Sequence, residues 1–186
     1  MSFIPLGVLA AAGAGGGTAF ESIQTVTASG GETSLSFSSI PQTYKSLQIR
    51  YIAKDTFSGS AGYNAFTVSV NTNNTWNTHY LYGNGATVTA GNLGAGIIFD
   101  VPNSGSGLTN IYGTGIIDLI DYSSTTKNKT LRAFTGLDTN SSSPAGRVYL
   151  LSLGRFDTSA ITSITFNAGD TAWAAGTKFA LYGIKG

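Results

Sequence analysis

The side chains that could carry out catalysis are few in this chain of 186 residues. It contains one histidine, His79, and no cysteine, which removes thiolate nucleophiles, Cys-ligated zinc and disulfides. A histidine-based catalytic pair would depend on His79 alone, and its aromatic, strand-like surroundings favour a structural role. We therefore predict no catalytic residue and expect a protein that is not an enzyme.

The acidic residues are also spaced unfavourably for catalysis. Asp118 and Asp121 are three apart in a predicted strand, so they point to opposite faces and do not form the carboxylate pair of a glycan-cleaving enzyme. We expect them to be solvated or paired with Lys or Arg. Other aspartates lie at predicted strand ends, where they cap backbone amides, and no Asp-x-Asp-x-Asp-Gly loop is present for calcium. No metal and no cofactor are predicted.

One segment contains the residue types of a binding site. Trp76, Tyr80 and Tyr82 lie close together, with Asn74 and Asn77 beside them. An exposed aromatic ring stacks on the apolar face of a neutral sugar, while amide side chains bond its hydroxyls. The alternative is that the aromatic rings fill the core and the asparagines form turns. The sequence leaves both interpretations open.

The charge balance argues against a nucleic-acid partner. Only 10% of residues are charged, and 10 Lys and Arg nearly balance 9 Asp and Glu, for a formal net charge of +1. The basic residues are scattered singly, so they form no patch that neutralises phosphates. Polarity comes mainly from Ser, Thr, Asn and Gly, which predicts a neutral surface rich in hydroxyl groups.

Alternation of apolar and polar residues dominates from Phe20 onward and is typical of half-buried strands. Turn-forming residues separate ten or so short strands, predicted at 20–28, 34–37, 47–53, 66–70, 78–82, 96–101, 113–122, 129–137, 147–156, 161–168 and 178–184. Without helices between them, the strands must pair antiparallel, because parallel pairs need long crossovers. We predict an all-β fold, an antiparallel β-sandwich of the jelly-roll type, in which residues 20–186 form a single domain.

Two of the predicted strands contain segments that are apolar on both faces, residues 116–120 and 148–153. A sandwich core covers only one side of each sheet. The second apolar side therefore indicates a further buried surface, most simply a subunit interface.

Residues 1–19 form an apolar, Ala/Gly-rich N-terminal arm without a charged side chain. A signal peptide would need a basic first region, and a membrane span would need a longer apolar run than one broken by glycine. We favour a third interpretation, an extended tether whose apolar tip inserts into a neighbouring subunit. The predicted assembly contacts are Phe3, Ile4, Pro5, Leu6, Val8 and Leu9.

The segments 20–27 and 35–50, and the C-terminal stretch 161–184, resemble virion proteins of tailed bacteriophages, in particular marine and cyanobacterial ones. The resemblance rests on patterns of strands and turns, so no functional residue is carried over from it. It implies a structural protein on the outside of the phage particle, either a trimeric capsid decoration (cement) protein or a component of the tail.

From these observations we expect a non-enzymatic homotrimer that binds the outer surface of the capsid and stabilises it. Its partners would be the major capsid protein or other virion proteins, with no nucleic acid and no membrane. The alternative is a tail fibre, adaptor or receptor-binding module that recognises host surface glycans through the aromatic segment.

Overall fold

The computed structural model describes residues 19–59, 62–73, 75–93, 99–102, 110–139, 146–169 and 171–186. Twelve strands run through these ranges: β1 (Phe20–Thr27), β2 (Ser34–Phe37), β3 (Ser46–Ala53), β4 (Tyr63–Val70), β5 (Asn77–Gly83), β6 (Val88–Leu93), β7 (Phe99–Pro102), β8 (Gly113–Ile120), β9 (Lys129–Leu137), β10 (Arg147–Arg155), β11 (Ile164–Ala168) and β12 (Lys178–Ile184). Within the same ranges, no helix is long and apolar enough to cross a membrane.

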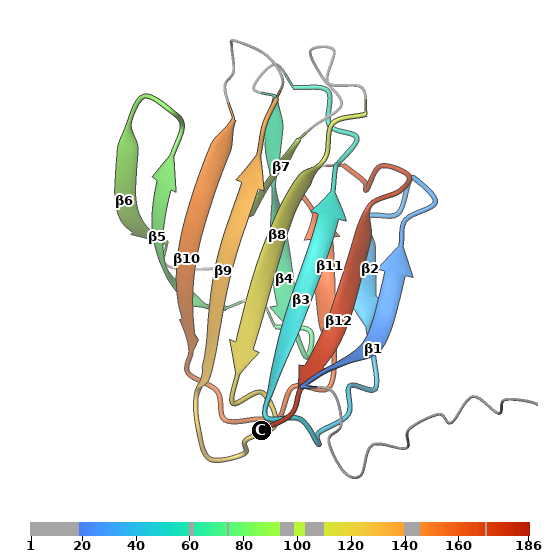
Figure 1. Cartoon of the computed structure of the whole chain (residues 1–186), viewed down its shortest axis with the longest axis vertical. Helices are drawn as coiled ribbons and strands as arrows, with labels where there is room; N and C mark the ends of the chain where they lie inside the picture. The colour runs from blue at the N-terminus through green and yellow to red at the C-terminus, as the bar shows by residue number, and fades with distance from the viewer. Residues whose placement is uncertain are drawn as a thin grey trace, which may run out of the picture.

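The strands form two sheets, and every pair is antiparallel. The large sheet has the order β1-β12-β3-β8-β9-β10-β5-β6, and the small sheet has the order β2-β11-β4-β7. Figure 1 shows the small sheet packed behind the large one, while β5 and β6 extend beyond it at one edge. The predicted all-β antiparallel sandwich is therefore confirmed.

The structure contains one strand that the sequence pattern did not reveal. The apolar residues of β6 are Val88, Ala90 and Leu93, and Leu93 breaks the alternation that the first two begin. It pairs with β5 along its whole length because a tight turn joins the two strands. In this turn, Gly85 has a φ of 86°, and the Asn84 side chain accepts hydrogen bonds from the backbone N–H groups of Ala86 and Thr87. The strand predicted at 96–101 is β7, and 94–98 lie outside the described residues.

Aromatic side chains fill the space between the two sheets. Phe166 of the small sheet stacks on Phe179 of the large sheet, with ring centres 3.9 Å apart. Phe66 and Trp173 pack edge-on around this pair. All four are buried, and the Trp173 indole donates a hydrogen bond to the Phe166 carbonyl, so the core has no exposed platform for a ligand here.

The outer face of the small sheet is polar and satisfies its own hydrogen bonds. The hydroxyls of Ser36 on β2 and Thr165 on β11 lie 2.9 Å apart, and Asn167 donates to the Ser69 hydroxyl on β4 at 3.2 Å. Cross-strand pairs of this kind suit a surface exposed to water.

Candidate functional site

The outer face of the large sheet contains a group of exposed apolar side chains, which we call the apolar face. It consists of Leu81, Val88, Ile116, Phe134, Val148 and Leu150, on five neighbouring strands. Val88 is 74% exposed and Phe134 is 59% exposed. A contiguous exposed group of large apolar residues on a folded domain marks an interaction surface.

Strand register brings the centre of the apolar face together. Leu81 is opposite Leu150, Leu150 is opposite Phe134, and Phe134 is opposite Ile116. These four residues therefore form one continuous row across β5, β10, β9 and β8. Directly opposite residues on neighbouring strands generally have Cβ atoms about 4.5–5.5 Å apart, close enough for their side chains to touch. The strands predicted to be apolar on both sides, β8 and β10, supply three of the six residues of the apolar face.

Phe134 stands between two hollows in this surface. The first has a volume of about 270 Å³ and lies over Gly83, with Val88, Val148 and Leu150 in its lining. The second, of about 350 Å³, lies on the other side of Phe134, toward Ile116. A ridge flanked by hollows is a shape into which apolar side chains of a partner can pack.

Polar residues border the apolar face on the next row of the sheet. Arg132 forms an ion pair with Asp118 at 3.8 Å, and Gln48 donates to the same carboxylate at 2.9 Å. The expectation that Asp118 pairs with a basic residue is confirmed, as is that for Asp121, whose carboxylate lies 3.3 Å from Lys127 Nζ. An apolar centre with a polar border is the usual anatomy of a protein–protein interface.

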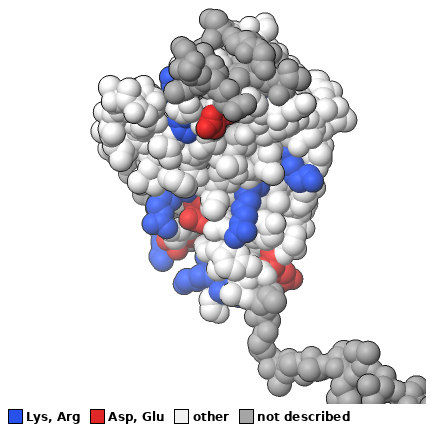
Figure 2. Space-filling view, turned by 45° about the horizontal axis from the view of Figure 1, so that its top comes forward, with Lys and Arg blue, Asp and Glu red and all other residues white. Residues whose placement is uncertain are grey.

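Basic side chains do not gather into a patch on the face shown in Figure 2. Lys and Arg stand apart from one another there, with acidic groups near some of them and uncharged surface between. Among the described residues, no group of three or more His, Cys, Asp or Glu side chains could hold a metal ion.

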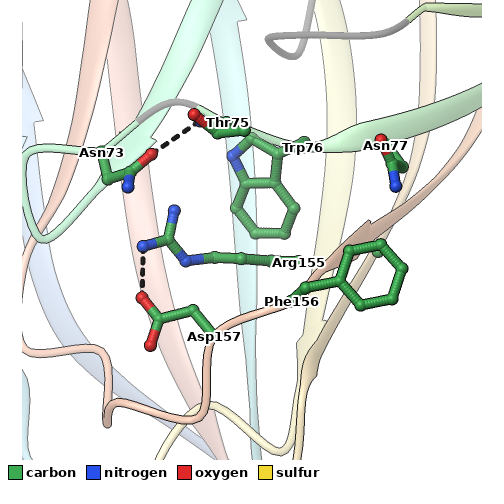
Figure 3. Close-up of a pocket in the computed structure, with 8 residues that line it drawn as sticks. Asn73, Thr75, Trp76, Asn77, Arg155, Phe156 and Asp157 are labelled. Carbon is green, nitrogen blue, oxygen red and sulfur yellow. Dashed lines mark hydrogen bonds and ion pairs between the residues drawn. The ribbon is translucent and has the colours of Figure 1, made fainter.

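A second feature is a pocket of about 310 Å³ where β5 begins and β10 ends, which we call the Trp76 pocket. It is lined by Asn73, Thr75, Trp76, Asn77, Gly154, Arg155, Phe156 and Asp157. Figure 3 shows the aliphatic part of Arg155 below the Trp76 ring, its guanidinium to the left of that ring, and Phe156 at the right of the pocket. The guanidinium carbon lies 6.0 Å from the centre of the indole ring.

The chain segments next to the pocket lining, around Asn71 and Thr158, are fixed by side-chain hydrogen bonds. Asn71 has a φ of 48°, and its side chain donates to the Ala160 carbonyl and accepts from the backbone N–H of Thr162. The buried ammonium of Lys129 donates to backbone carbonyls of Ser124, Lys127 and Thr158. Burial lowers the pKa of Lys129, and nearby carboxylates oppose that shift.

Arg155 and Asp157 form the charged part of the pocket. Arg155 is 5% exposed, and its Nη2 donates to the Asp157 carboxylate. The pKa of Asp157 is lowered to about 2, first by the hydrogen bond from the backbone N–H of Ser159 and then by that from Arg155. The carboxylate therefore stays ionised near neutral pH and offsets the charge of Arg155.

Within the part of the chain that the structure describes, two buried donors in the pocket find no hydrogen-bond partner: Trp76 Nε1 and Arg155 Nη1. A buried N–H group left unpaired costs about 1–3 kcal/mol. Such orphan donors are unusual in folded proteins, and at a pocket they indicate a missing acceptor.

The residues predicted for glycan binding divide between the core and the pocket. Trp76 is 1% exposed and cannot serve as an open stacking platform, so of the two interpretations left open for this ring the structure shows the buried one. Tyr80 and Tyr82 are half-buried on the inner side of β5, and Tyr82 stacks on Tyr149 with ring centres 5.1 Å apart. Asn77 lines the Trp76 pocket.

The remaining sequence predictions fall elsewhere. Asn74 and the arm contacts Phe3, Ile4, Pro5, Leu6, Val8 and Leu9 lie outside the described residues. His79 lies exposed on the outer side of β5, opposite Ser152, away from the Trp76 pocket.

Sequence reasoning did not single out Arg155, Phe156 or Phe134. A signal for Arg155 existed, because it continues the inward positions of Leu151 and Leu153 on β10, where a charged residue is unexpected. The exposed Phe134 had no such signal, since alternation alone does not say which side of a two-faced strand meets the second sheet.

Comparisons with protein-family models, curated proteins and solved structures found no match to this chain.

Proposed function

We propose that this chain is a non-enzymatic structural protein that functions by packing, and that it is a virion surface protein of the capsid decoration type. In this proposal it forms a homotrimer, sits on the outer surface of a phage capsid and binds the major capsid protein. The resemblance of its terminal segments to virion proteins and its neutral, hydroxyl-rich composition support this assignment. Such a surface keeps its hydration at any ionic strength, unlike one that depends on screened charges.

The observation that carries the proposal is the apolar face of the large sheet. Removing one half-exposed side chain of this size from water is worth roughly 1 kcal/mol. The six together therefore supply roughly 5–6 kcal/mol, from which the cost of association is subtracted. This is a sizeable driving force for covering one face, whereas β2, β4 and β11 of the small sheet expose no large apolar side chain among the described residues.

We assign the neighbouring copies of this chain around the threefold axis of the trimer as the occupants of the apolar face. The ridge of Phe134 and the hollows beside it lie on the same surface, so each copy carries both the side chain that inserts and the space that receives it. The border supplies both signs of charge, from Arg132 and Asp118, so adjacent copies in the trimer can meet without like charges opposed.

The strand order supports the jelly-roll part of the proposal. In a jelly roll the chain alternates between two packed sheets of four strands each. Here β2, β4, β7 and β11 lie in the small sheet, and β3, β5, β6 and β8 lie in the large one. The hairpin β9–β10 is inserted between β8 and β5, and β12 and β1 extend the opposite edge.

The N-terminal arm has a supporting role in this proposal. Its apolar tip, residues 3–9, would add a second contact to the neighbour, and two linked contacts bind more tightly than either alone. Deleting residues 1–17 should weaken assembly without affecting the fold of the sandwich. Unchanged assembly would remove the arm from the proposal.

The mass of the purified chain, measured by light scattering, tests self-association. We expect three times the mass of one chain, and Phe134→Glu should reduce it to that of a monomer because a charge cannot be buried unpaired in the interface. The matched control is Ser36→Glu on the outer face of the small sheet, which should leave the oligomer intact. A monomeric wild type, or equal loss in both variants, would contradict the proposal.

Copy number tests the placement on the virion. In purified particles of the virus that encodes this chain, a stained gel should show a band comparable with that of the major capsid protein. A faint band would instead place the chain in the tail, and no band would refute the virion role.

A further inference from the structure

The Trp76 pocket carries an inference that is independent of assembly, because it lies apart from the apolar face. None of its lining residues belongs to the apolar face or to the two hollows beside Phe134. It is also the place where two buried donors, Trp76 Nε1 and Arg155 Nη1, lack a partner.

A single acceptor atom serves both donors only where it lies within hydrogen-bond distance of each. The Arg155 guanidinium carbon lies 6.0 Å from the indole centre, and an oxygen accepting from both N–H groups would be about 2.9 Å from each nitrogen. In Figure 3 the indole nitrogen of Trp76 faces the side of the pocket on which Asn73 lies, as does the free end of the guanidinium. Asn73, whose exposed side chain accepts a hydrogen bond from the backbone N–H of Thr75, lines this side of the pocket.

The charge of the pocket selects a neutral acceptor over an anion. Asp157 accepts from Arg155 Nη2 and remains ionised, because the hydrogen bonds to its carboxylate lower its pKa to about 2. A bound carboxylate would therefore meet Asp157 as well as Arg155. A neutral carbonyl oxygen has two lone pairs for the two donors and adds no like charge.

The rim of the pocket fits a sugar ring. Phe156 is 78% exposed, and no fold requirement explains an aromatic ring in water at this point. Asn77 and Thr75 line the same pocket with exposed polar side chains that can bond hydroxyls. An aromatic ring beside amide and hydroxyl groups is the combination that recognises neutral carbohydrate.

We propose that the Trp76 pocket binds an N-acetylated sugar, with the acetamido carbonyl accepting hydrogen bonds from Trp76 Nε1 and Arg155 Nη1 and the sugar ring stacking on Phe156. The ligand of this proposal is a glycan that carries an acetamido group. It contacts Trp76, which precedes β5, and also Arg155 and Phe156 at the end of β10.

The two tryptophans allow a direct test with the full chain. Its two indole N–H groups give two resonances in an ¹⁵N–¹H spectrum, and Trp173→Phe identifies which one belongs to Trp76. Titration with N-acetylglucosamine should shift the Trp76 resonance and leave that of Trp173, which is bonded to Phe166, in place. Glucose, which lacks the acetamido group, should leave both in place.

Variants then separate the parts of the site. Phe156→Ser removes an exposed ring, so the fold is retained, and affinity for N-acetylglucosamine should fall about tenfold. Trp76→Phe keeps an aromatic core side chain but loses the donor, and affinity should again fall about tenfold. Ser36→Glu on the distant small sheet should leave the affinity unchanged.

Three results would overturn the proposal. The first is that N-acetylglucosamine leaves the Trp76 resonance unmoved, which means that water alone satisfies the donors. The second is an equal shift with glucose, which removes the role of the carbonyl. The third is a shift with sodium glucuronate or acetate and none with N-acetylglucosamine, which makes the pocket an anion site. None of these results bears on the oligomeric state, so the assembly proposal is tested separately.

Discussion

In both sheets the side chains alternate between the core and the outer face, but the two outer faces differ in polarity. On the small sheet, the outward positions are hydroxyls and amides that bond one another across strands, as Ser36 and Thr165 do. On the large sheet, Leu81, Leu150 and Phe134 occupy equivalent outward positions and have no such partners. One face of this protein is polar and bonds within itself, and the other exposes apolar side chains, which a partner covers in the proposed function.

The difference lies in how each row of side chains meets solvent. A hydroxyl pair keeps its bonds to water when exposed, so covering its row gains no free energy. An apolar row gains free energy only when it is covered, in proportion to the area removed from water. The two outer faces therefore differ in their tendency to associate without any difference in charge, in keeping with the low content of charged residues.

The largest effect is expected when the same residue type is truncated inside and outside the sandwich. Phe166→Ala removes a ring stacked on Phe179 between the sheets and should lower the free energy of unfolding by about 3–5 kcal/mol. Phe134→Ala on the apolar face should cost under about 1 kcal/mol in the monomer. Urea unfolding at a concentration where the chain is monomeric measures both. Similar losses of unfolding free energy in the two variants would mean that Phe134 packs as tightly as a core residue, which would contradict its assignment to an exposed face.

A smaller effect is expected when the polar face is made apolar. The double change Ser36→Val with Thr165→Val removes both partners of one hydroxyl pair and should change monomer stability by at most about 1 kcal/mol. The double variant has an apolar outer face on each sheet, so we expect it to form assemblies that keep growing instead of a closed oligomer. The mass measured by light scattering should then rise steadily with concentration.

The matched control for that experiment is Ser36→Val alone, which leaves the Thr165 hydroxyl to bond water. It should retain the closed oligomer of the wild type. If the double variant also retains a closed oligomer, a polar outer face on the small sheet is not needed to limit assembly.

The smallest expected effect is the loss of stability at low pH, which we attribute to two carboxylates in loops, Glu32 and Asp157. Hydrogen bonds from Ser29, first from its side chain and then from its backbone, lower the pKa of Glu32 to about 2, and that of Asp157 is likewise about 2. Because these values lie below the usual carboxyl pKa, the stability they contribute is fully present above about pH 4.5 and is lost as the pH falls toward 2. The urea midpoint should be level from neutral pH to about 5 and then fall.

Glu32→Gln and Asp157→Asn should each make that decline shallower, since each removes one group whose pKa differs between the folded and unfolded states. His79→Gln, exposed on β5, serves as the control and should leave the decline between pH 4.5 and 2 unchanged. An unaltered slope in both loop variants would show that other carboxylates set the acid limit.

Much of the fold could be predicted because alternation in the sequence directly reflects the two sides of a strand. The long strands β3, β8, β9 and β10 have clear alternation or an apolar run, and they were placed within a few residues of their observed bounds. β6 could not be predicted, because its pairing is imposed by β5 and the turn at Asn84 rather than by its own side chains.

The candidate sites show the same division. The two-sided apolar pattern of β8 and β10 predicted that a further surface exists, but not that Phe134 lies at its centre between two hollows. For Trp76 the sequence left an exposed ring and a core ring open, because burial depends on tertiary packing, and the structure shows a ring that is 1% exposed.

By itself, the sequence determined the composition of this surface, its low charge, and the presence of strands with two apolar sides, because these are properties of residue type and local period. Only the tertiary structure decided which side became core, which formed the apolar face, and which two N–H groups met in one pocket. Those outcomes depend on the register between strands far apart in the chain, and register is set by the packing of the two sheets as a whole.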